Sequence, residues 1–283
     1  MTSSLKTVLL LGLMSGLFVT IGNALGGPSG MVLALIMACV MNIGMYWFSD
    51  RIVLKMHRAE QVTSESHPEL VAMVSKLAQQ AGMPVPKVYI IPDFTPNAFA
   101  TGRSPSNSAV AFTQGILNLL SPAELSGVAA HELAHIKHYD TLISTIAACL
   151  AGAISMLANM AQWAMIFGGR RSDQESEGGS GMGQLLTLLI APIAAMVIQM
   201  AISRSREFIA DEEGGRIHGN PLDLASALSR IHNRMDSLPA SSSTSMAHLY
   251  IMSPLAGGGI ISWFSTHPPV EERIRRLKLQ TGT

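Results

Sequence analysis

The residues best suited to do chemistry are His131, Glu132 and His135, which stand in the order His-Glu-Leu-Ala-His. On an α-helix, positions i and i+4 lie on one face, so both imidazoles can reach a single metal ion. Glu132 lies beside them, where its carboxylate can take a proton from a water held near the histidines. Two imidazoles and a neighbouring acid at this spacing predict a zinc site of the hydrolytic kind.

The motif needs a helix to position it, and the preceding residues supply a start signal. Ser121, Pro122 and Glu124 have the pattern of an N-cap, a first-turn proline and the second half of a capping box. No proline interrupts the chain between Pro122 and His138. We therefore expect one helix that runs without a break from Pro122 into the apolar segment 141–169.

The composition is typical of a membrane protein. Charged residues make up only 13% of the 283 residues, and the mean hydropathy is +0.33, whereas charged residues average about 25% in soluble domains. The stretch Thr7–Ser49 has no charged residue or histidine and is interrupted by Gly27 and Pro28, which predicts two spans joined by a turn. The stretches 141–169 and 178–203 predict a second hairpin, which either crosses the membrane or lies partly against protein.

Positive residues indicate how these spans are oriented. Lys6 precedes the first span, and Arg51, Lys55 and Arg58 follow the second, while the turn between the spans is uncharged. Because positive residues favour the cytoplasmic side, we expect segment 50–140 to face the cytoplasm. If the histidine helix continues into a span, the site lies within about 5–15 Å of that membrane face, at about 1.5 Å per residue.

The segment between the first apolar hairpin and the histidine helix has the pattern of a small α+β unit. Hydrophobic spacing predicts a helix from Ser66 and Pro68 to Gly82, and β-rich runs predict strands at 88–91 and 109–112. Between these strands lie four residues that form either an exposed edge strand, to which a peptide can pair, or an ordinary loop. These residues are Asn97, Ala98, Phe99 and Ala100.

A catalytic zinc site needs three protein ligands and an open position, so two histidines leave one ligand to find. Glu207 is a candidate because it follows the last apolar segment on an expected helix, with Asp211 one turn further on the same face. Asp211 could accept a hydrogen bond from a zinc histidine and fix its tautomer. Spacing alone does not separate Glu207 from its competitors, which are Glu212, Glu213, His218 and His267.

Taken in order, four motifs resemble the HtpX-type membrane metalloproteases of peptidase family M48. The motifs are Asn97–Ala100, His131–His135, the segment 203–211 with Glu207 and Asp211, and Thr266–Pro269. The resemblance covers essentially the whole chain. It implies a mainly α, α+β fold, with about four transmembrane helices and a gluzincin-like cytoplasmic metalloprotease domain that carries a small β-sheet.

The resemblance also implies roles for individual residues. One zinc ion would be held by His131, His135 and Glu207, with Glu132 as the catalytic base and Asp211 supporting a ligand. The strand Asn97–Ala100 would present the substrate backbone. His267 would stabilise the oxyanion, although His-Pro-Pro could equally be a rigid turn that starts a helix at Val270. We interpret the run from Glu271 to Lys278, which includes Arg273, as a solvated helix face.

The implied organisation has four parts: two transmembrane helices (1–49), the first part of the protease domain (50–140), a membrane hairpin (141–203) and the second part of the protease domain (204–283). The implied function is a zinc endopeptidase of the bacterial inner membrane that cleaves damaged or misfolded membrane proteins. The alternative is a membrane scaffold or transporter with a structural zinc site, but such a site is closed by four ligands and needs no spare acid. Zero net charge and no basic-aromatic pattern argue against nucleic acid.

Overall fold

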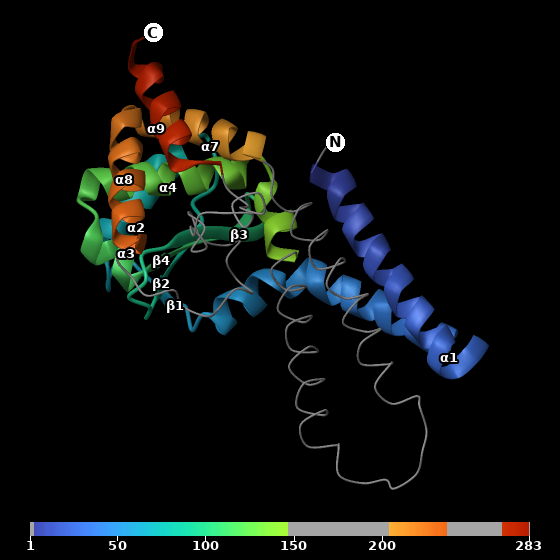
Figure 1. The fold of residues 1–283 in the computed structure, drawn as a ribbon. Coiled ribbons are helices and arrows are strands. Elements are labelled where there is room, and N and C mark those ends of the chain that lie inside the picture. Colours follow the sequence, from blue (N-terminus) through green and yellow to red (C-terminus); the bar gives the residue numbers. More distant parts are fainter. Residues whose placement is uncertain (1–2, 147–203, 237–267, 283) are drawn as a thin grey trace, which may run out of the picture.

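The computed structural model describes residues 3–146, 204–236 and 268–282. These residues are mainly helical and include a four-stranded sheet in the order β1-β2-β4-β3. Figure 1 shows α4, α7, α8 and α9 gathered on one side of the sheet, while α1 extends away from it. The elements are α1 (Ser3–Met56), β1 (Glu60–Val62), α2 (Pro68–Gln80), β2 (Lys87–Ile91), β3 (Ala98–Ser104), β4 (Asn107–Thr113), α3 (Gln114–Leu119), α4 (Pro122–Lys137), α7 (Arg204–His218), α8 (Pro221–Asp236), α9 (Val270–Leu279) and the 3₁₀ turn η3 (Gln280–Gly282).

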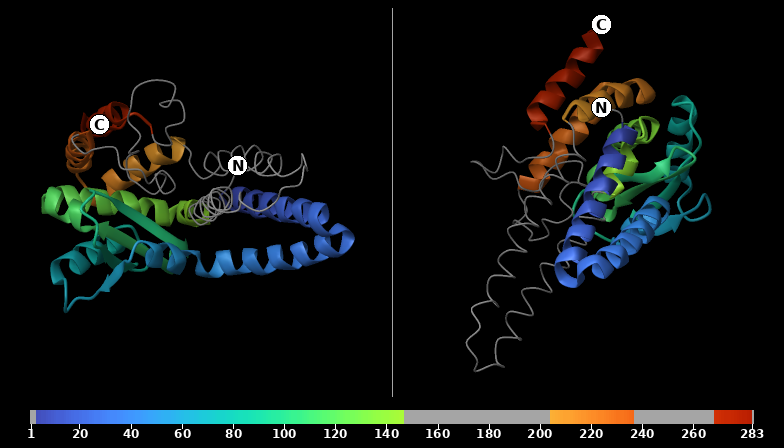
Figure 2. Two further views of the ribbon diagram at one scale, coloured as in Figure 1. Left: turned by 60° about the horizontal axis from the view of Figure 1, so that its bottom comes forward. Right: turned by 90° about the vertical axis from the view of Figure 1, so that its right-hand side faces the viewer.

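Helix α1 turns back on itself and forms two limbs that lie side by side (Figures 1 and 2). The turn contains Gly27, whose φ of 57° is left-handed, followed by Pro28. The amide of Asn42 on the second limb donates a hydrogen bond to Ser15 Oγ on the first, at 2.8 Å. The predicted two-limbed hairpin is therefore confirmed.

The expected number of transmembrane helices is not confirmed. Within the described ranges, one segment, Gly27–Gly44, is long and apolar enough to cross a membrane. Most of the second expected hairpin, from residue 147 to 203, lies outside the described residues.

The sheet is mixed, because β2 pairs in parallel with β4 while β1 and β3 pair antiparallel with β2 and β4. The strands expected at 88–91 and 109–112 are present as β2 and β4. Segment 98–104 forms β3 at one edge, so the strand alternative is correct for Ala98–Ala100. Strand β1 was not predicted, because three residues are too few to show an alternating pattern.

Both faces of strand β4 are buried, each against a different layer. Val110 and Phe112 belong to the main core, which includes residues of α2, α4, α7 and α8. Ala109 and Ala111 belong to a smaller core on the opposite face, together with Val53 near the end of α1. The alternation of side chains along a strand thus lets one strand join the apolar hairpin to the helical layer.

Helix α4 begins as the sequence predicts and is also tied to a second helix. Ser121 and Glu124 form the expected capping box. The Glu124 carboxylate also accepts hydrogen bonds from Ser226 Oγ at 2.7 Å and Arg230 Nη1 at 2.8 Å, both on α8. Burial raises the pKa of Glu124, but the hydrogen bonds from Ser226 and Ser121 and the charge of Arg230 outweigh burial and lower it.

The expected continuous helix from Pro122 into the apolar segment was wrong. Helix α4 ends at Lys137, and Tyr139 adopts a left-handed φ of 59° before a new helical stretch, 140–146, begins. Left-handed backbone cannot continue a right-handed helix, so the chain changes direction here. The histidine helix is therefore not a direct extension of an apolar helix, and the depth estimate based on that continuity loses its basis.

Glu124→Gln should destabilise the fold by about 1–3 kcal/mol near neutral pH, because charge-assisted hydrogen bonds to two helices are lost. The folded pKa of Glu124 lies below its ordinary value of 4.5, so its stabilising contribution is present above that value and disappears as pH falls through the folded pKa. The difference between wild type and variant should therefore shrink in acid.

Thermal unfolding in detergent, near neutral pH and at about pH 3.5, measures this difference. Glu69→Gln is the matched control, since Glu69 is an exposed acid in the first turn of α2. Equal melting shifts for the two variants at neutral pH would contradict the role of Glu124.

Candidate metal centre

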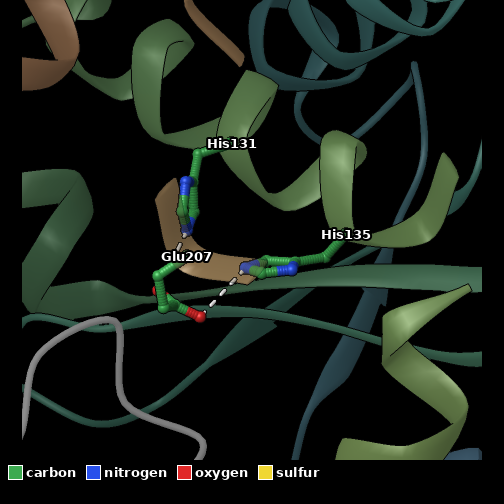
Figure 3. Close-up of side chains that lie close together, drawn as sticks. All are labelled: His131, His135 and Glu207. Atoms are coloured by element: carbon green, nitrogen blue, oxygen red, sulfur yellow. Dashed lines mark ion pairs between the residues drawn. The ribbon is translucent and has the colours of Figure 1, made fainter. Parts of the chain in front are cut away.

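Helices α4 and α7 bring two histidines and one carboxylate together (Figure 3). His131 and His135 lie one turn apart on α4, with ring centroids 4.7 Å apart. Their Nε2 atoms lie 3.7 Å and 3.4 Å from the two carboxylate oxygens of Glu207 on α7. The structure thus selects Glu207, which spacing alone had not separated from its competitors.

A close helix crossing places Glu207 beside the histidines. A Cβ on Gly214 would lie 2.9 Å from the backbone N and Cα of His131, so a larger residue would push α7 away from α4. Glu207 lies two helical turns before Gly214, on the same face of α7. The contact at Gly214 therefore presents Glu207 to the histidine pair.

The three side chains fit one divalent cation. Their ligating atoms all lie within 4.8 Å of one another. Zinc bound tetrahedrally at about 2.0–2.1 Å has ligand atoms about 3.3–3.4 Å apart, close to the 3.4 and 3.7 Å measured to Glu207. Each Nε2 faces Glu207 while each Nδ1 faces another carboxylate, an arrangement that suits Nε2 as the metal-binding atom. Arg273 Nη2 also lies 3.5 Å from Nε2 of His131.

The first of these carboxylates is Asp211, as the sequence analysis expected. Asp211 Oδ1 lies 3.0 Å from Nδ1 of His131, and both of its oxygens accept hydrogen bonds from Arg273, at 2.7 and 2.8 Å. Burial raises the pKa of Asp211, but the charge and hydrogen bonds of Arg273 outweigh burial and lower it. Asp211 is therefore held as a carboxylate next to His131.

Arg273 corrects an expectation about the C-terminal helix. The mixed charges around it predict a solvated face, yet the exposed fraction of Arg273 is 0%. It lies between Asp211 and Glu207, with Nη1 3.6 Å from a Glu207 oxygen. Helix α9 thus contributes a buried cation to the site, and the mixed charges of Glu271–Lys278 concealed it.

The second carboxylate is Asp140, which sequence reasoning missed. Asp140 Oδ2 lies 3.4 Å from Nδ1 of His135, and Oδ1 accepts a hydrogen bond from Arg206 Nη1 at 3.1 Å. On an unbroken helix, a residue five positions after His135 would point about 140° away from it. The turn at His138 and Tyr139 instead brings Asp140 back to the histidine.

Glu132 lies next to His131 on α4 and contacts the edge strand β3. Its Oε2 accepts a hydrogen bond from the backbone N–H of Ala100 at 2.9 Å, and only 5% of the residue is exposed. Burial raises the pKa of Glu132, and the charge of Glu207 acts in the same direction against the opposing effects of the two histidines. A buried carboxylate with a raised pKa is suited to accept a proton.

Of the two alternatives for Asn97–Ala100, the edge strand is present, but it is not exposed. The strand lies at the sheet edge, but the exposed fractions of these four residues are only 1–6%. Helix α4 packs against β3, and Glu132 already occupies the N–H of Ala100.

Charge balance also favours a cation at this position. Burial lowers the pKa of His135, but the neighbouring carboxylates of Glu207, Asp140 and Glu132 outweigh burial and raise it to about 10. The cluster therefore attracts positive charge strongly, and a divalent metal ion would meet that demand.

The other candidates for the third ligand that the structure describes interact with residues outside the cluster. Glu212 pairs with Arg216, and Glu213 lies 2.6 Å from Lys137 Nζ. The imidazole of His218 lies between Ser126 and Asp223, at 3.1 and 2.7 Å. His267 lies outside the described residues, although helix α9 does begin at Val270, directly after the two prolines.

Comparison with known proteins supports the assignment from the site. The sequence pattern of the family described as "Peptidase family M48" matches residues 64–281. The protein named Protease HtpX homolog from Desulforapulum autotrophicum is 52% identical over 98% of this chain and 90% of its own length. The Protease HtpX homolog from Persephonella marina is 53% identical over 97% of this chain and 96% of its own.

A solved structure, Ste24p from S. mikatae, has a similar fold, with a TM-score of 0.50 at 16% identity. The match covers 94% of this chain but 65% of that chain, slightly less than two thirds. At this level of identity the likeness concerns the fold.

The fold, the ligand cluster and these relatives define a metalloprotease. The chain belongs to peptidase family M48, and within that family it is of the HtpX type.

Asp140→Asn should weaken zinc binding by about 10- to 100-fold, the range found when the partner of a metal-binding histidine is removed. Competition with a chromophoric chelator measures this affinity in the full chain. Asp223→Asn is the matched control, because Asp223 contacts a histidine outside the cluster. Wild-type zinc affinity in Asp140→Asn would show that Asp140 does not support His135.

Proposed function

We propose that this chain is a membrane-bound zinc endopeptidase that cleaves damaged or misfolded membrane proteins, with Glu132 as its general base. One observation carries the proposal: a buried carboxylate with a raised pKa lies next to a cluster of three zinc-type ligands. The family supports proteolysis, and the ligand cluster supports the dependence on zinc.

The proposed chemistry assigns a separate task to each group. The metal would be held by His131, His135 and Glu207. When bound, it would act as a Lewis acid that lowers the pKa of water and polarises a peptide carbonyl. Glu132 takes the proton of the attacking water and later delivers it to the leaving amine. The Ala100 N–H orients the Glu132 carboxylate for both transfers.

Two further residue sets have proposed roles. Asn97, Ala98, Phe99 and Ala100 would align the substrate backbone, since β3 has a partner strand on one side only within the described sheet. Because these residues are buried, we infer that the peptide must displace covering groups before it pairs with β3. His267 would stabilise the oxyanion together with the metal.

We propose that the site faces the cytoplasm of a bacterial cell. The two limbs of α1 run antiparallel, so its turn points away from the sheet and both of its ends lie on the side that faces the sheet (Figure 2). Positive residues stand at both ends, namely Lys6 before the hairpin and Arg51, Lys55 and Arg58 after it. This distribution favours the cytoplasmic side. A site next to the bilayer would suit substrates that are themselves membrane proteins.

The alternative, a scaffold or transporter with a structural zinc ion, accounts less well for Glu132. Structural zinc sites are normally closed by four protein ligands. In the described part of the chain three ligands converge, and Glu132 remains buried beside them as an additional acid.

Glu132→Gln should bind zinc as the wild type does but lose about 10²- to 10⁴-fold in cleavage rate, because general-base catalysis is removed. Cleavage of an unfolded reporter protein by detergent-purified enzyme measures the rate, and elemental analysis measures bound zinc. Chelation should abolish wild-type activity, and added zinc should restore it.

Glu212→Gln is the control, since this acid lies on α7 but pairs with Arg216. Wild-type turnover in Glu132→Gln would refute the assignment of the base. A zinc-loaded, folded wild type that cleaves no reporter would instead favour the structural-zinc alternative.

A further inference from the structure

Three cations line one face at the end of the apolar hairpin. Arg51 and Lys55 lie one turn apart near the end of α1 at Met56, and Arg58 lies in the turn that follows the helix. With Tyr89 of β2 they surround a cavity of about 560 Å³. The cavity is lined by Arg51, Leu54, Lys55, Arg58, Ala59 and Tyr89, and no carboxylate is among them.

Asp50 lies close enough to raise the pKa of Tyr89 beyond the effect of burial, but it is not paired with these cations. Within the described residues, no carboxylate forms an ion pair with Arg51, Lys55 or Arg58, although cations elsewhere, such as Lys137 and Arg230, have acidic partners. Three like charges close together repel one another unless an anion joins them. The cavity therefore has the charge of an anion site.

The fourth polar group is suited to the same ligand. The hydroxyl of Tyr89 donates a long hydrogen bond to Gln61 Oε1, at 3.4 Å, which it would give up to bind an anion. Burial and the nearby charge of Asp50 raise the pKa of Tyr89 against the opposing effect of Arg51. The phenol thus keeps its proton and can donate a hydrogen bond to an anion.

A rigid frame holds these groups in place. Val53 and Leu54 are buried against the sheet, with exposed fractions of 0% and 6%. The turn after α1 is closed by a hydrogen bond from the backbone N–H of Ala59 to Leu54 O at 2.9 Å, and Arg58 adopts a left-handed φ of 53°. Arg51 and Lys55 are thus on a helix that packs against the sheet, and Arg58 is on the closed turn that follows it.

The cavity lies where a membrane surface would be. The apolar segment Gly27–Gly44 ends shortly before it, and an aromatic cluster of Tyr46, Trp47 and Phe48 stands between them. Exposed aromatic rings of this kind occupy the headgroup level of a bilayer. The guanidinium of Arg103, near the end of β3, lies 4.4 Å from the centre of the Trp47 ring. This contact holds the aromatic residues at a defined position relative to β3.

We propose that this cavity binds the phosphate headgroup of an anionic phospholipid, with Arg51, Lys55 and Arg58 as charge partners and Tyr89 as a hydrogen-bond donor. Guanidinium groups pair well with phosphate, and basic clusters directly after an apolar span favour anionic lipids. The bound lipid would anchor the end of α1, and with it the sheet that carries β3, at a fixed height on the membrane. This binding is independent of the metal chemistry.

Fluorescence of Trp47 tests the proposal in the full-length chain with Trp163→Phe and Trp263→Phe, which leave one tryptophan. In mixed micelles, brominated phosphatidylglycerol should quench Trp47 at lower mole fraction than brominated phosphatidylcholine does. Replacing each cation by Gln should weaken this preference by about fivefold per residue, and the triple variant Arg51→Gln/Lys55→Gln/Arg58→Gln should lose it.

The matched control is Lys76→Gln/Lys278→Gln/Arg216→Gln, which changes the net charge equally at exposed positions. The control should keep the preference, and both triple variants should retain wild-type zinc content as evidence of folding. The proposal is overturned if the cavity variant keeps the preference or if the control loses it equally.

A second arm separates lipid from free phosphate. The preference should persist in excess inorganic phosphate, compared with chloride at equal ionic strength. Selective loss in phosphate would identify a soluble phosphate site and overturn the lipid assignment.

Discussion

The structure depends on one close crossing, where α7 meets α4 at Gly214 and His131. This contact collects four carboxylates, two histidines and two arginines in a largely buried space. Uncompensated negative charge would be costly there, because burial disfavours ionised groups. Arginines neutralise the outer carboxylates, while the inner histidines and Glu207 retain a strong demand for positive charge. This unbalanced negative charge suits the crossing to a metal ion.

Other parts of the fold serve this charge balance. Each histidine has its own acid, and each acid has its own arginine: Asp211 with Arg273, and Asp140 with Arg206. These arginines come from two different helices, so α9 and the start of α7 both take part in a site centred on α4. Ala100 adds a link from the sheet to Glu132. A substitution at the site therefore alters contacts that join α4 to α7, α9 and the sheet.

Local patterns predicted part of this arrangement. The capping box, the two strands, the α1 hairpin and the histidine pair follow from spacing within short segments. Asp140 did not, since only the left-handed turn at Tyr139 returns it to His135. Arg273 did not, because a buried arginine within a run of mixed charges has no signal until its partner Asp211 is placed. The burial of Asn97–Ala100 likewise depends on α4, which is distant in sequence.

We infer that His131, His135 and Glu207 together hold one zinc ion. X-ray absorption at the zinc edge of purified protein would show these ligands. We expect one zinc per chain, nitrogen and oxygen ligands at about 2.0–2.1 Å, and outer scattering from two imidazoles that falls to one in His135→Ala. A sulfur ligand, or a spectrum unchanged by His135→Ala, would contradict this inference.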